Sequence, residues 1–192
     1  MDPLLLAIPE SFDTERLTIR TPSFDDVPEL VTAVNESLAE LQPWMPWAQK
    51  PNTVEEQQIR LRKVVARWIL REELVLHLFL KNTTTLVGSS GAHHFDWAVP
   101  SCETGYWLRT RFTRQGLATE AVHGITRFLF ENLKLRRLDL RCNRLNVRSA
   151  AVAQRCGFLL EGVLRNEGVT HTGELRDTMV FSKLSPDEFH RS

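Results

Sequence analysis

After residue 73 the hydrophobic pattern changes from a helical to a strand-like period, and this change constrains the fold more than any other feature. Apolar residues recur at helical spacing over residues 27–41, and again after the capping box of Thr53 and Glu56. Three strand-like segments then follow one another: LVLHLFLK, LVGSSGAHHFD and ETGYWLR, within residues 74–109. The short connections NTTT and WAVPSC between these segments predict an antiparallel meander.

The segments on either side of the meander complete an α+β domain. RLTIR at residues 16–20 alternates apolar and charged side chains, as a half-buried strand does. After the meander we expect a helix over 117–133, a strand at 136–142, a helix over 147–156 and a closing hairpin. The predicted order is β-α-α-β-β-β-α-β-α-β-β, with one mixed, mostly antiparallel sheet flanked by helices. The length and the lack of repeats or linkers indicate a single domain over 1–192.

The charge distribution indicates a compact anionic ligand. The chain has 24 basic and 24 acidic residues, so its net charge gives no reason to expect DNA or an anionic membrane as a partner. Residues 109–148, however, hold ten Lys and Arg against three acidic residues. Such a basic region on a neutral protein fits a small polyanion better than a long nucleic acid, the alternative being a solvated basic face.

The cysteines and the start of the sequence favour a cytoplasmic location. Cys102, Cys142 and Cys156 form no CxxC pair, and an odd number of cysteines suits reduced, buried thiols better than disulfides. The start, MDPLLLAIPE, lacks the basic segment of a signal peptide. No apolar run approaches the roughly 20 residues that span a bilayer. We therefore expect a cytoplasmic protein without membrane association.

The stretch RFTRQGLATEA (111–121) places a glycine and two arginines at the start of a predicted helix. Positive charge is usually avoided there, because that end of the helix dipole is already positive. The arrangement is favourable if an anion binds the free N–H groups of the first turn, with Gly116 allowing close approach and Arg111 and Arg114 adding charge-assisted hydrogen bonds. The GxGxxG and P-loop patterns are absent, and a helix cap with solvated arginines is the alternative.

Two stretches, GYWLRTRFTRQGLATEA (105–121) and CNRLNVRSAAVAQRCGFLLEGVLR (142–165), carry a family resemblance. The most specific parts are the GYWL segment with its loop and the N-x-x-S…GF…EG run of Asn146, Ser149, Gly157, Phe158, Glu161 and Gly162. Together they resemble the GNAT acetyltransferases, in particular the RimL/RimJ-like branch of ribosomal-protein N-acetyltransferases. The resemblance covers most of the chain. It implies a GNAT fold, acetyl-CoA as the co-substrate and a homodimer.

The resemblance also implies where acetyl-CoA binds. It would occupy the gap where the GYWL strand diverges from the strand before Asn143, with the pantetheine pairing with this strand and the pyrophosphate on the loop amides. The implied cofactor-binding residues are Trp107, Leu108, Arg109, Arg114, Gln115, Gly116, Leu117, Ala118, Thr119, Asn146 and Ser149. Thr113 and Arg114 depart from the family loop, which usually has Arg or Gln at the first of these positions and Gly at the second.

The pKa of the acceptor amine decides how strong a base the reaction needs. At pH 7 an α-amine costs about 1 kcal/mol to deprotonate, whereas a lysine costs about 4–5 kcal/mol. A modest base, acting directly or through water, therefore serves an N-terminal acceptor. The predicted acceptor is the N-terminal α-amine of a protein such as a ribosomal protein. The alternatives are a small amine (a polyamine, an aminoacyl compound or an aminoglycoside) and a CoA-binding module without catalysis.

The resemblance suggests two catalytic residues. Asp96 would be the base at the end of the strand before GYWL, and Ser149 would protonate or position the thiolate. The alternatives for these two are an exposed turn aspartate and a serine that caps its own helix. His93 and His94 adjoin Asp96 and should point to opposite faces of the sheet, where either could relay a proton. Glu103 could hold a water molecule in the cleft, the alternative being that it pairs with a neighbouring residue.

The remaining candidates form the walls of the site. Trp44 and Trp47, in the proline-broken segment QPWMPWAQKP, are expected to line the acceptor site, the alternative being a hydrophobic plug between the first two helices. A backbone N–H near Leu108 would hold the oxyanion. We expect no metal, because no third ligand lies at a suitable spacing from His93 and His94.

Overall fold

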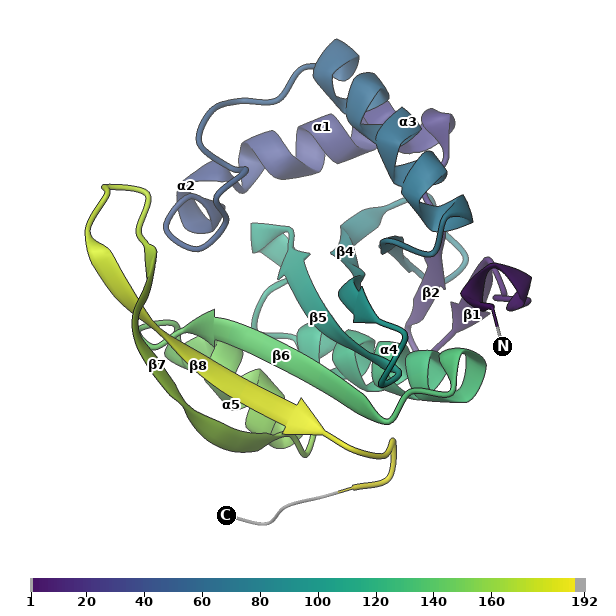
Figure 1. Ribbon diagram of the computed structural model, residues 1–192. Helices are drawn as coiled ribbons and strands as arrows, with labels where there is room; N and C mark the ends of the chain where they lie inside the picture. The colour runs from purple at the N-terminus through teal and green to yellow at the C-terminus, as the bar shows by residue number, and fades with distance from the viewer. Residues whose placement is uncertain (1, 189–192) are drawn as a thin grey trace.

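The fold is built on one eight-stranded sheet, and the computed structural model describes residues 2–188 (Figure 1). The strands lie in the spatial order β1-β2-β3-β4-β5-β6-β8-β7. They are β1 (Ser11–Asp13), β2 (Leu17–Arg20), β3 (Leu74–Leu80), β4 (Leu86–Asp96), β5 (Ser101–Leu108), β6 (Arg137–Asn143), β7 (Leu159–Val169) and β8 (Leu175–Lys183). The helices are α1 (Val27–Glu36), α2 (Leu38–Leu41), α3 (Val54–Ile69), α4 (Leu117–Leu133) and α5 (Val147–Arg155).

Helices cover both faces of the sheet. On one face α1 packs on β4 and α3 on β3, and on the other α4 packs on β4 and β5 and α5 on β6 and β7 (Figure 1). Side chains of β3 alternate between the two faces and so contribute to two cores. Leu76 belongs to the large core that includes the buried face of α4, whereas Val75 packs against a cluster of Val27, Leu61 and Val64 from α1 and α3.

One pair of neighbouring strands, β5 and β6, is parallel, and the other pairs in the described sheet are antiparallel. The parallel pairing joins residues 101–104 of β5 to residues 137–140 of β6 and then ends. Beyond it β5 continues along β4 to Leu108, while β6 continues along β8 to Asn143. The edge of β5 that faces β6 therefore has no strand partner after Thr104.

Buried contacts fix the end of β5 to the first helices. Arg109 is 2% exposed, and its guanidinium makes ion pairs with Glu36 and with Glu29, the latter at 2.6 Å. Hydrogen bonds from Arg109 hold the pKa of Glu36 below its usual value. Ser37 is buried where α1 gives way to α2, and its hydroxyl accepts the Thr110 N–H at 2.9 Å. The loop that leaves β5 thus starts from a fixed position.

The predicted order of elements and the mixed, mostly antiparallel sheet are confirmed, with two additions. β1 is three residues long, too short for the alternation that identifies a strand. The helix predicted over 27–41 is divided into α1 and α2, because Ser37 leaves the helical path with φ −106° and ψ 4°. The three cysteines are free and buried. None of the described helices is long and apolar enough to cross a lipid bilayer.

Candidate active site

The loop from β5 to α4 presents a row of free backbone N–H groups. Gly116, the N-cap of α4, has φ 81° and Arg114 has φ 63°, so two left-handed residues turn the chain into the helix. Within residues 2–188, no protein acceptor bonds to the N–H groups of residues 114–119. A side chain at position 116 would be strained by this φ and would lie 3.3 Å from Arg16 Nη2. Such a row at the positive end of a helix dipole is suited to phosphate.

Arg16 holds this loop in place. Its Nη1 donates to the Gln115 carbonyl at 2.9 Å, and its Nε pairs with Glu120 at 2.6 Å. Glu120 also accepts hydrogen bonds from Thr14 Oγ1 and from the Arg16 N–H. Burial opposes ionisation of Glu120, but these hydrogen bonds outweigh it and lower the pKa of Glu120. The start of α4 is therefore tied to the turn between β1 and β2, which orients the amides in advance.

A cavity of about 760 Å³ adjoins the loop and the start of α5. This volume lies within the roughly 300–1,000 Å³ of typical ligand pockets. Eight predicted cofactor-binding residues line it: Trp107, Leu108, Arg114, Gly116, Ala118, Thr119, Asn146 and Ser149. The other three are not among the residues that line it, although the N–H groups of Gln115 and Leu117 belong to the row of free amides. Arg109 is held in its buried ion pairs, the Gln115 carbonyl accepts from Arg16, and Leu117 is 2% exposed in the core.

The edge of β5 offers a hydrogen-bond donor in the gap between β5 and β6. The Arg109 N–H donates to the Val87 carbonyl in β4 at 2.8 Å. Successive N–H groups of a strand point to opposite edges, so the Leu108 N–H points away from β4. It therefore faces the gap that opens after Thr104. This is the place where the sequence predicted an oxyanion donor.

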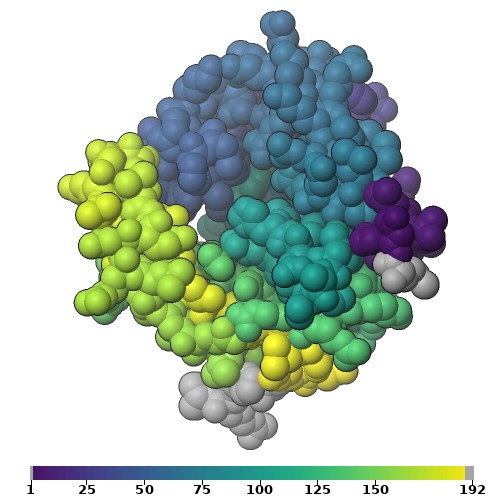
Figure 2. Space-filling view, viewed as in Figure 1, coloured from purple at the N-terminus to yellow at the C-terminus, as the bar shows by residue number. Residues whose placement is uncertain are grey.

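A second cavity, of about 470 Å³, lies against the other side of the gap. We call it the acceptor cavity. β3, β4, β5, the end of β6 and the segment 44–47 contribute to its walls. Six of the predicted site residues line it: Trp44, Trp47, His93, Trp107, Asn146 and Ser149. Figure 2 shows that this face is hollowed between the blue helical segment and the yellow-green hairpin of β7 and β8. The acceptor cavity therefore has access to the surface.

The two cavities meet at Tyr106 and Ser149. They share six lining residues: Trp44, Met45, Tyr106, Trp107, Asn146 and Ser149. The Tyr106 hydroxyl donates to Ser149 Oγ at 3.4 Å. Burial raises the pKa of Tyr106 to about 12, so the hydroxyl stays protonated at neutral pH. The side chain that caps α5 is Asn146, which accepts the Ser149 N–H at 3.1 Å and leaves the Ser149 hydroxyl to the junction.

Tyr106 is a functional candidate to which the sequence motifs assign no role, although it belongs to the GYWL segment. The available signal was that it is the single tyrosine of the chain, placed in the strand that borders the predicted cofactor gap. Its contact with Ser149 spans 43 residues of sequence, and it forms because α5 packs on β6, the strand next to β5.

Glu103 is the centre of a charged cluster in the wall of the acceptor cavity. Its carboxylate lies 3.5 Å from His93 Nε2, 3.3 Å from His94 Nδ1 and 3.5 Å from Arg141 Nε. Burial would raise the pKa of Glu103, but hydrogen bonds from both histidines and the charge of Arg141 outweigh it, and the net shift is downward. Glu103 is therefore an ionised group that can orient a neighbouring imidazole.

The prediction that His93 and His94 face opposite sides of the sheet is wrong, because a β-bulge intervenes. The register between β4 and β5 shifts after His93, and His94 has φ 53°. A bulge re-aims side chains, and here both imidazoles reach Glu103. The three side chains bring possible ligand atoms within 4.8 Å of one another, a proximity hidden from the sequence spacing. Because Arg141 also contacts this carboxylate, we interpret the group as a hydrogen-bonded cluster.

Asp96, the base expected from the sequence, lies apart from both cavities. It ends β4, is exposed, and its Oδ1 accepts the N–H groups of Ala98 at 2.9 Å and Val99 at 3.3 Å. These contacts are those of a turn aspartate. The structure brings Ser149 together with Glu103 and His93 in the acceptor cavity, and it does not bring Asp96 there.

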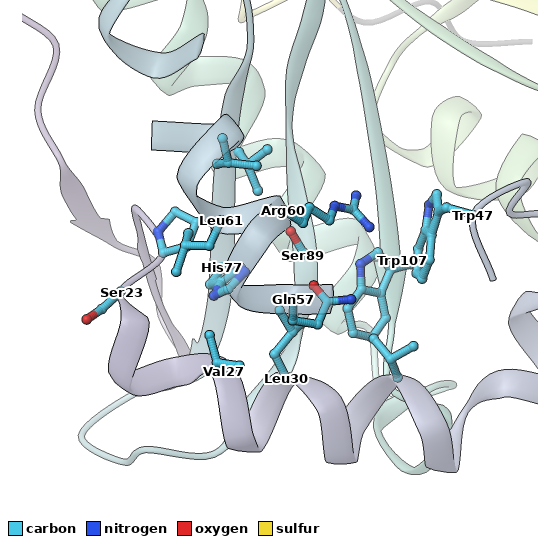
Figure 3. A pocket seen from close by; sticks show the side chains of 14 residues that line it. Ser23, Val27, Leu30, Trp47, Gln57, Arg60, Leu61, His77, Ser89 and Trp107 are labelled. Carbon is cyan, nitrogen blue, oxygen red and sulfur yellow. The ribbon is translucent and has the colours of Figure 1, made fainter. Parts of the chain in front are cut away.

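Aromatic side chains form the outer wall of the acceptor cavity. Trp47 meets Trp107 edge-on at 5.9 Å between ring centroids, and Trp44 borders both large cavities. Behind Trp47, a small cavity of about 40 Å³ extends between α1 and α3, with His77 at its inner end (Figure 3). Trp44 and Trp47 therefore line the acceptor cavity, and Trp47 also borders the space between α1 and α3.

Comparison with known proteins decides the family. The family model described as an acetyltransferase (GNAT) domain matches residues 16–159. The chain belongs to this family. It is therefore an N-acetyltransferase that uses acetyl-CoA, and the resemblance drawn from the sequence is confirmed.

Several relatives match over most of their length. YdaF of Bacillus subtilis (strain 168) is 26% identical over 174 residues, which cover 88% of this chain and 92% of YdaF. The ribosomal-protein-serine acetyltransferase of Escherichia coli (strain K12) is 24% identical over 153 residues, 79% of this chain and 84% of that protein. The structure of RimL, the ribosomal L7/L12 α-N-protein acetyltransferase, in complex with coenzyme A superposes with a TM-score of 0.84 at 22% identity. This superposition covers 94% of this chain and 99% of RimL.

The residues of this site fit acetyl-CoA. The free amides of residues 114–119 match a pyrophosphate, and the open edge of β5 at Leu108 matches the amide-bearing pantetheine. The cavity beside them leads to Tyr106 and Ser149, where the thioester end would lie. Bound acetyl-CoA supplies the acetyl group in an activated thioester.

Proposed function

We propose that this N-acetyltransferase acts on the N-terminal α-amine of a protein such as a ribosomal protein. The observation that carries the proposal is the meeting of two cavities at Tyr106 and Ser149, one fitted to acetyl-CoA and the other open to the surface. A chain terminus can enter such an open cavity with its amine first. The names of the Escherichia coli relative and of RimL, both modifiers of ribosomal proteins, support this class of acceptor.

In this proposal His93 accepts the proton of the acceptor ammonium, directly or through a water molecule. Glu103 hydrogen-bonds to His93, orients the ring and stabilises the imidazolium that forms. The lowered pKa of Glu103 keeps its carboxylate ionised for this task. Deprotonation of an α-amine at pH 7 costs only about 1 kcal/mol, so a weak base such as an imidazole is sufficient. Asp96 is not assigned this role, because it does not line the acceptor cavity.

Ser149 and Tyr106 act on the departing sulfur. Ser149 Oγ lies at the junction and can donate a hydrogen bond to the thiolate, and Tyr106 donates to Ser149 and strengthens that donor. The Leu108 N–H, which faces the gap, holds the oxyanion that develops on the acetyl carbonyl. The loop amides of residues 114–119 keep the donor molecule in register with these groups.

A thiol-release assay with a panel of acceptors tests this function. The panel contains a serine-leading peptide without lysine, the same peptide with a blocked N-terminus, a blocked peptide with lysine, and several small amines. We expect thiol release with the free-amine peptide and none with the two blocked peptides. Release with small amines alone would contradict the proposal in favour of a small-molecule acceptor. Tight CoA binding without release on any acceptor would favour a CoA-binding module.

We further propose that the chain works as a single domain, in the cytoplasm, as a homodimer. Its three free, buried thiols suit a reducing compartment. The edge strand β7 carries exposed apolar side chains, among them Leu159, Leu160 and Leu164, which could pair with a second copy. The mass in solution by light scattering tests the dimer, and a value equal to one chain would contradict it.

A further inference from the structure

Arg60 occupies an unusual position in the acceptor cavity. Its side chain extends from α3 toward the space between Trp47 and Trp107 (Figure 3). It lines both the acceptor cavity and the small cavity behind Trp47. The guanidinium carbon lies 5.3 Å from the centre of the Trp47 ring. This aromatic face gives the planar cation a favourable place in the wall of both cavities.

No carboxylate in the described part of the chain lies within ion-pair distance of Arg60. Of the two arginines that line the acceptor cavity, Arg141 contacts Glu103, and Arg60 has no such partner. Glu73 attracts it from farther away, but that carboxylate is already paired with Arg67 at 2.9 Å. The Arg60 side chain is exposed to solvent, so it needs no partner within the chain.

An exposed arginine that has no partner in the described chain and lies in the wall of a cavity is available to an anionic ligand. Arg109 and Arg20, by contrast, are engaged within the chain: Arg109 is paired with two glutamates, and Arg20 makes two hydrogen bonds to Asp26. The guanidinium fork of Arg60 is left available at the wall of a substrate cavity. Such a fork matches the two oxygens of a carboxylate.

We propose that Arg60 is a specificity-determining residue that binds a carboxylate of the acceptor, supplied by an acidic side chain a few residues behind the N-terminal amine. This inference rests on the proposed function and narrows its substrate class to N-termini followed by Asp or Glu. The amine would lie toward His93 and Ser149, and the carboxylate would lie between Trp47 and Trp107 in the same cavity. A phosphate on a small amine offers similar anionic oxygens, and the test separates the two.

A set of serine-leading peptides tests the proposal. Each carries Asp or the isosteric Asn at the second, third or fourth position, and acetylation is followed by thiol release. For the wild type we expect one position at which Asp lowers KM at least about tenfold relative to Asn. In Arg60→Met this preference disappears, because KM for the Asp peptide rises to that for the Asn peptide.

Arg62→Met is a matched control. Arg62 lies on the same helix, and its guanidinium carbon is also 5.3 Å from the centre of an aromatic ring, that of Phe24. It lines neither the acceptor cavity nor the cavity beside the loop from β5 to α4. We expect Arg62→Met to keep the preference for Asp. Equal KM values for Asp and Asn peptides in the wild type, or a preference that survives in Arg60→Met, would overturn the proposal.

Binding separates the failure of this inference from failure of the proposed function. If no peptide is acetylated, the proposed function fails. Binding is then measured by tryptophan fluorescence, because Trp47 lies beside Arg60. The ligands are the Asp and Asn peptides and O-phosphoserine, with serine as the control for the phosphate. Arg60-dependent binding of Asp peptides would uphold the carboxylate site. Arg60-dependent binding of O-phosphoserine alone would overturn the carboxylate in favour of phosphate. Binding that does not depend on Arg60 would overturn the proposal entirely.

Discussion

Replacing Tyr106 by phenylalanine removes one hydroxyl at the junction of the two cavities and keeps the ring. The pKa of Tyr106, about 12, sets what this hydroxyl can do. A thiol has a pKa of roughly 8.5, so a complete proton transfer from Tyr106 to a thiolate would be uphill by about 5 kcal/mol. Tyr106 therefore keeps its proton and acts as a hydrogen-bond donor through Ser149, which lies 3.4 Å away.

The expected loss follows from that role. The Tyr106 hydroxyl donates to the neutral Ser149 hydroxyl, and such a hydrogen bond contributes about 0.5–1.5 kcal/mol, which corresponds to roughly a 2- to 13-fold lower kcat for Tyr106→Phe. KM for acetyl-CoA should not change, because the amides of the loop hold the pyrophosphate elsewhere. Since Tyr106 acts through Ser149, Tyr106→Phe should cost little more in a Ser149→Ala background.

Steady-state thiol release with saturating acetyl-CoA measures these effects, and a thermal unfolding midpoint equal to that of the wild type shows that Tyr106→Phe has kept the fold. Between pH 7 and 9 the ratio of wild-type to variant kcat should be constant, because Tyr106 remains protonated throughout this range. A variant with wild-type kcat, or full additivity of the Tyr106 and Ser149 effects, would refute the reasoning.

Three other substitutions have definite expected outcomes. Gly116→Ala forces a side chain into φ 81°, at a cost of about 1–2 kcal/mol, and calorimetry should show weaker CoA binding; unchanged affinity would contradict the role of the loop. Glu103→Gln should lower kcat/KM for the acceptor roughly 10²- to 10⁴-fold without affecting CoA affinity, and equal loss in Asp96→Asn would contradict the assignment. Burial lowers the pKa of His77, so the folded chain resists its protonation and stability should fall as pH drops below about 6.5. Denaturant unfolding at several pH values should show a shallower fall in His77→Gln, and an identical slope would contradict this.

Local patterns in the sequence predict most of the fold, because its long elements each show a clear period. α3 begins at the predicted capping box of Thr53 and Glu56, and the three strands of the meander appear in the predicted order. β1 and the break at Ser37 escape prediction for different reasons. β1 depends on pairing with β2, and the break depends on a hydrogen bond from Thr110, far away in the sequence.

The candidate site is predicted less completely, because several of its contacts depend on tertiary structure. The loop and helix start around Gly116 are local, and their sequence indicates an anion site. The alternation rule misplaces His94, because a bulge in β4 is not encoded by any short motif. The pairing of β4 with β5 places Glu103 opposite His93, and the sequence alone favoured Asp96. The packing of α5 on β6, the strand next to β5, similarly gives Tyr106 its partner.

The most direct test of the account is to locate the transferred acetyl group by tandem mass spectrometry. The purified protein is incubated with acetyl-CoA and a serine-leading peptide that has a free N-terminus and one internal lysine. The account predicts a single acetyl group on the α-amine, with the yield reduced in Tyr106→Phe and Glu103→Gln. An acetyl group on the lysine, or transfer that both variants support as well as the wild type, would contradict it.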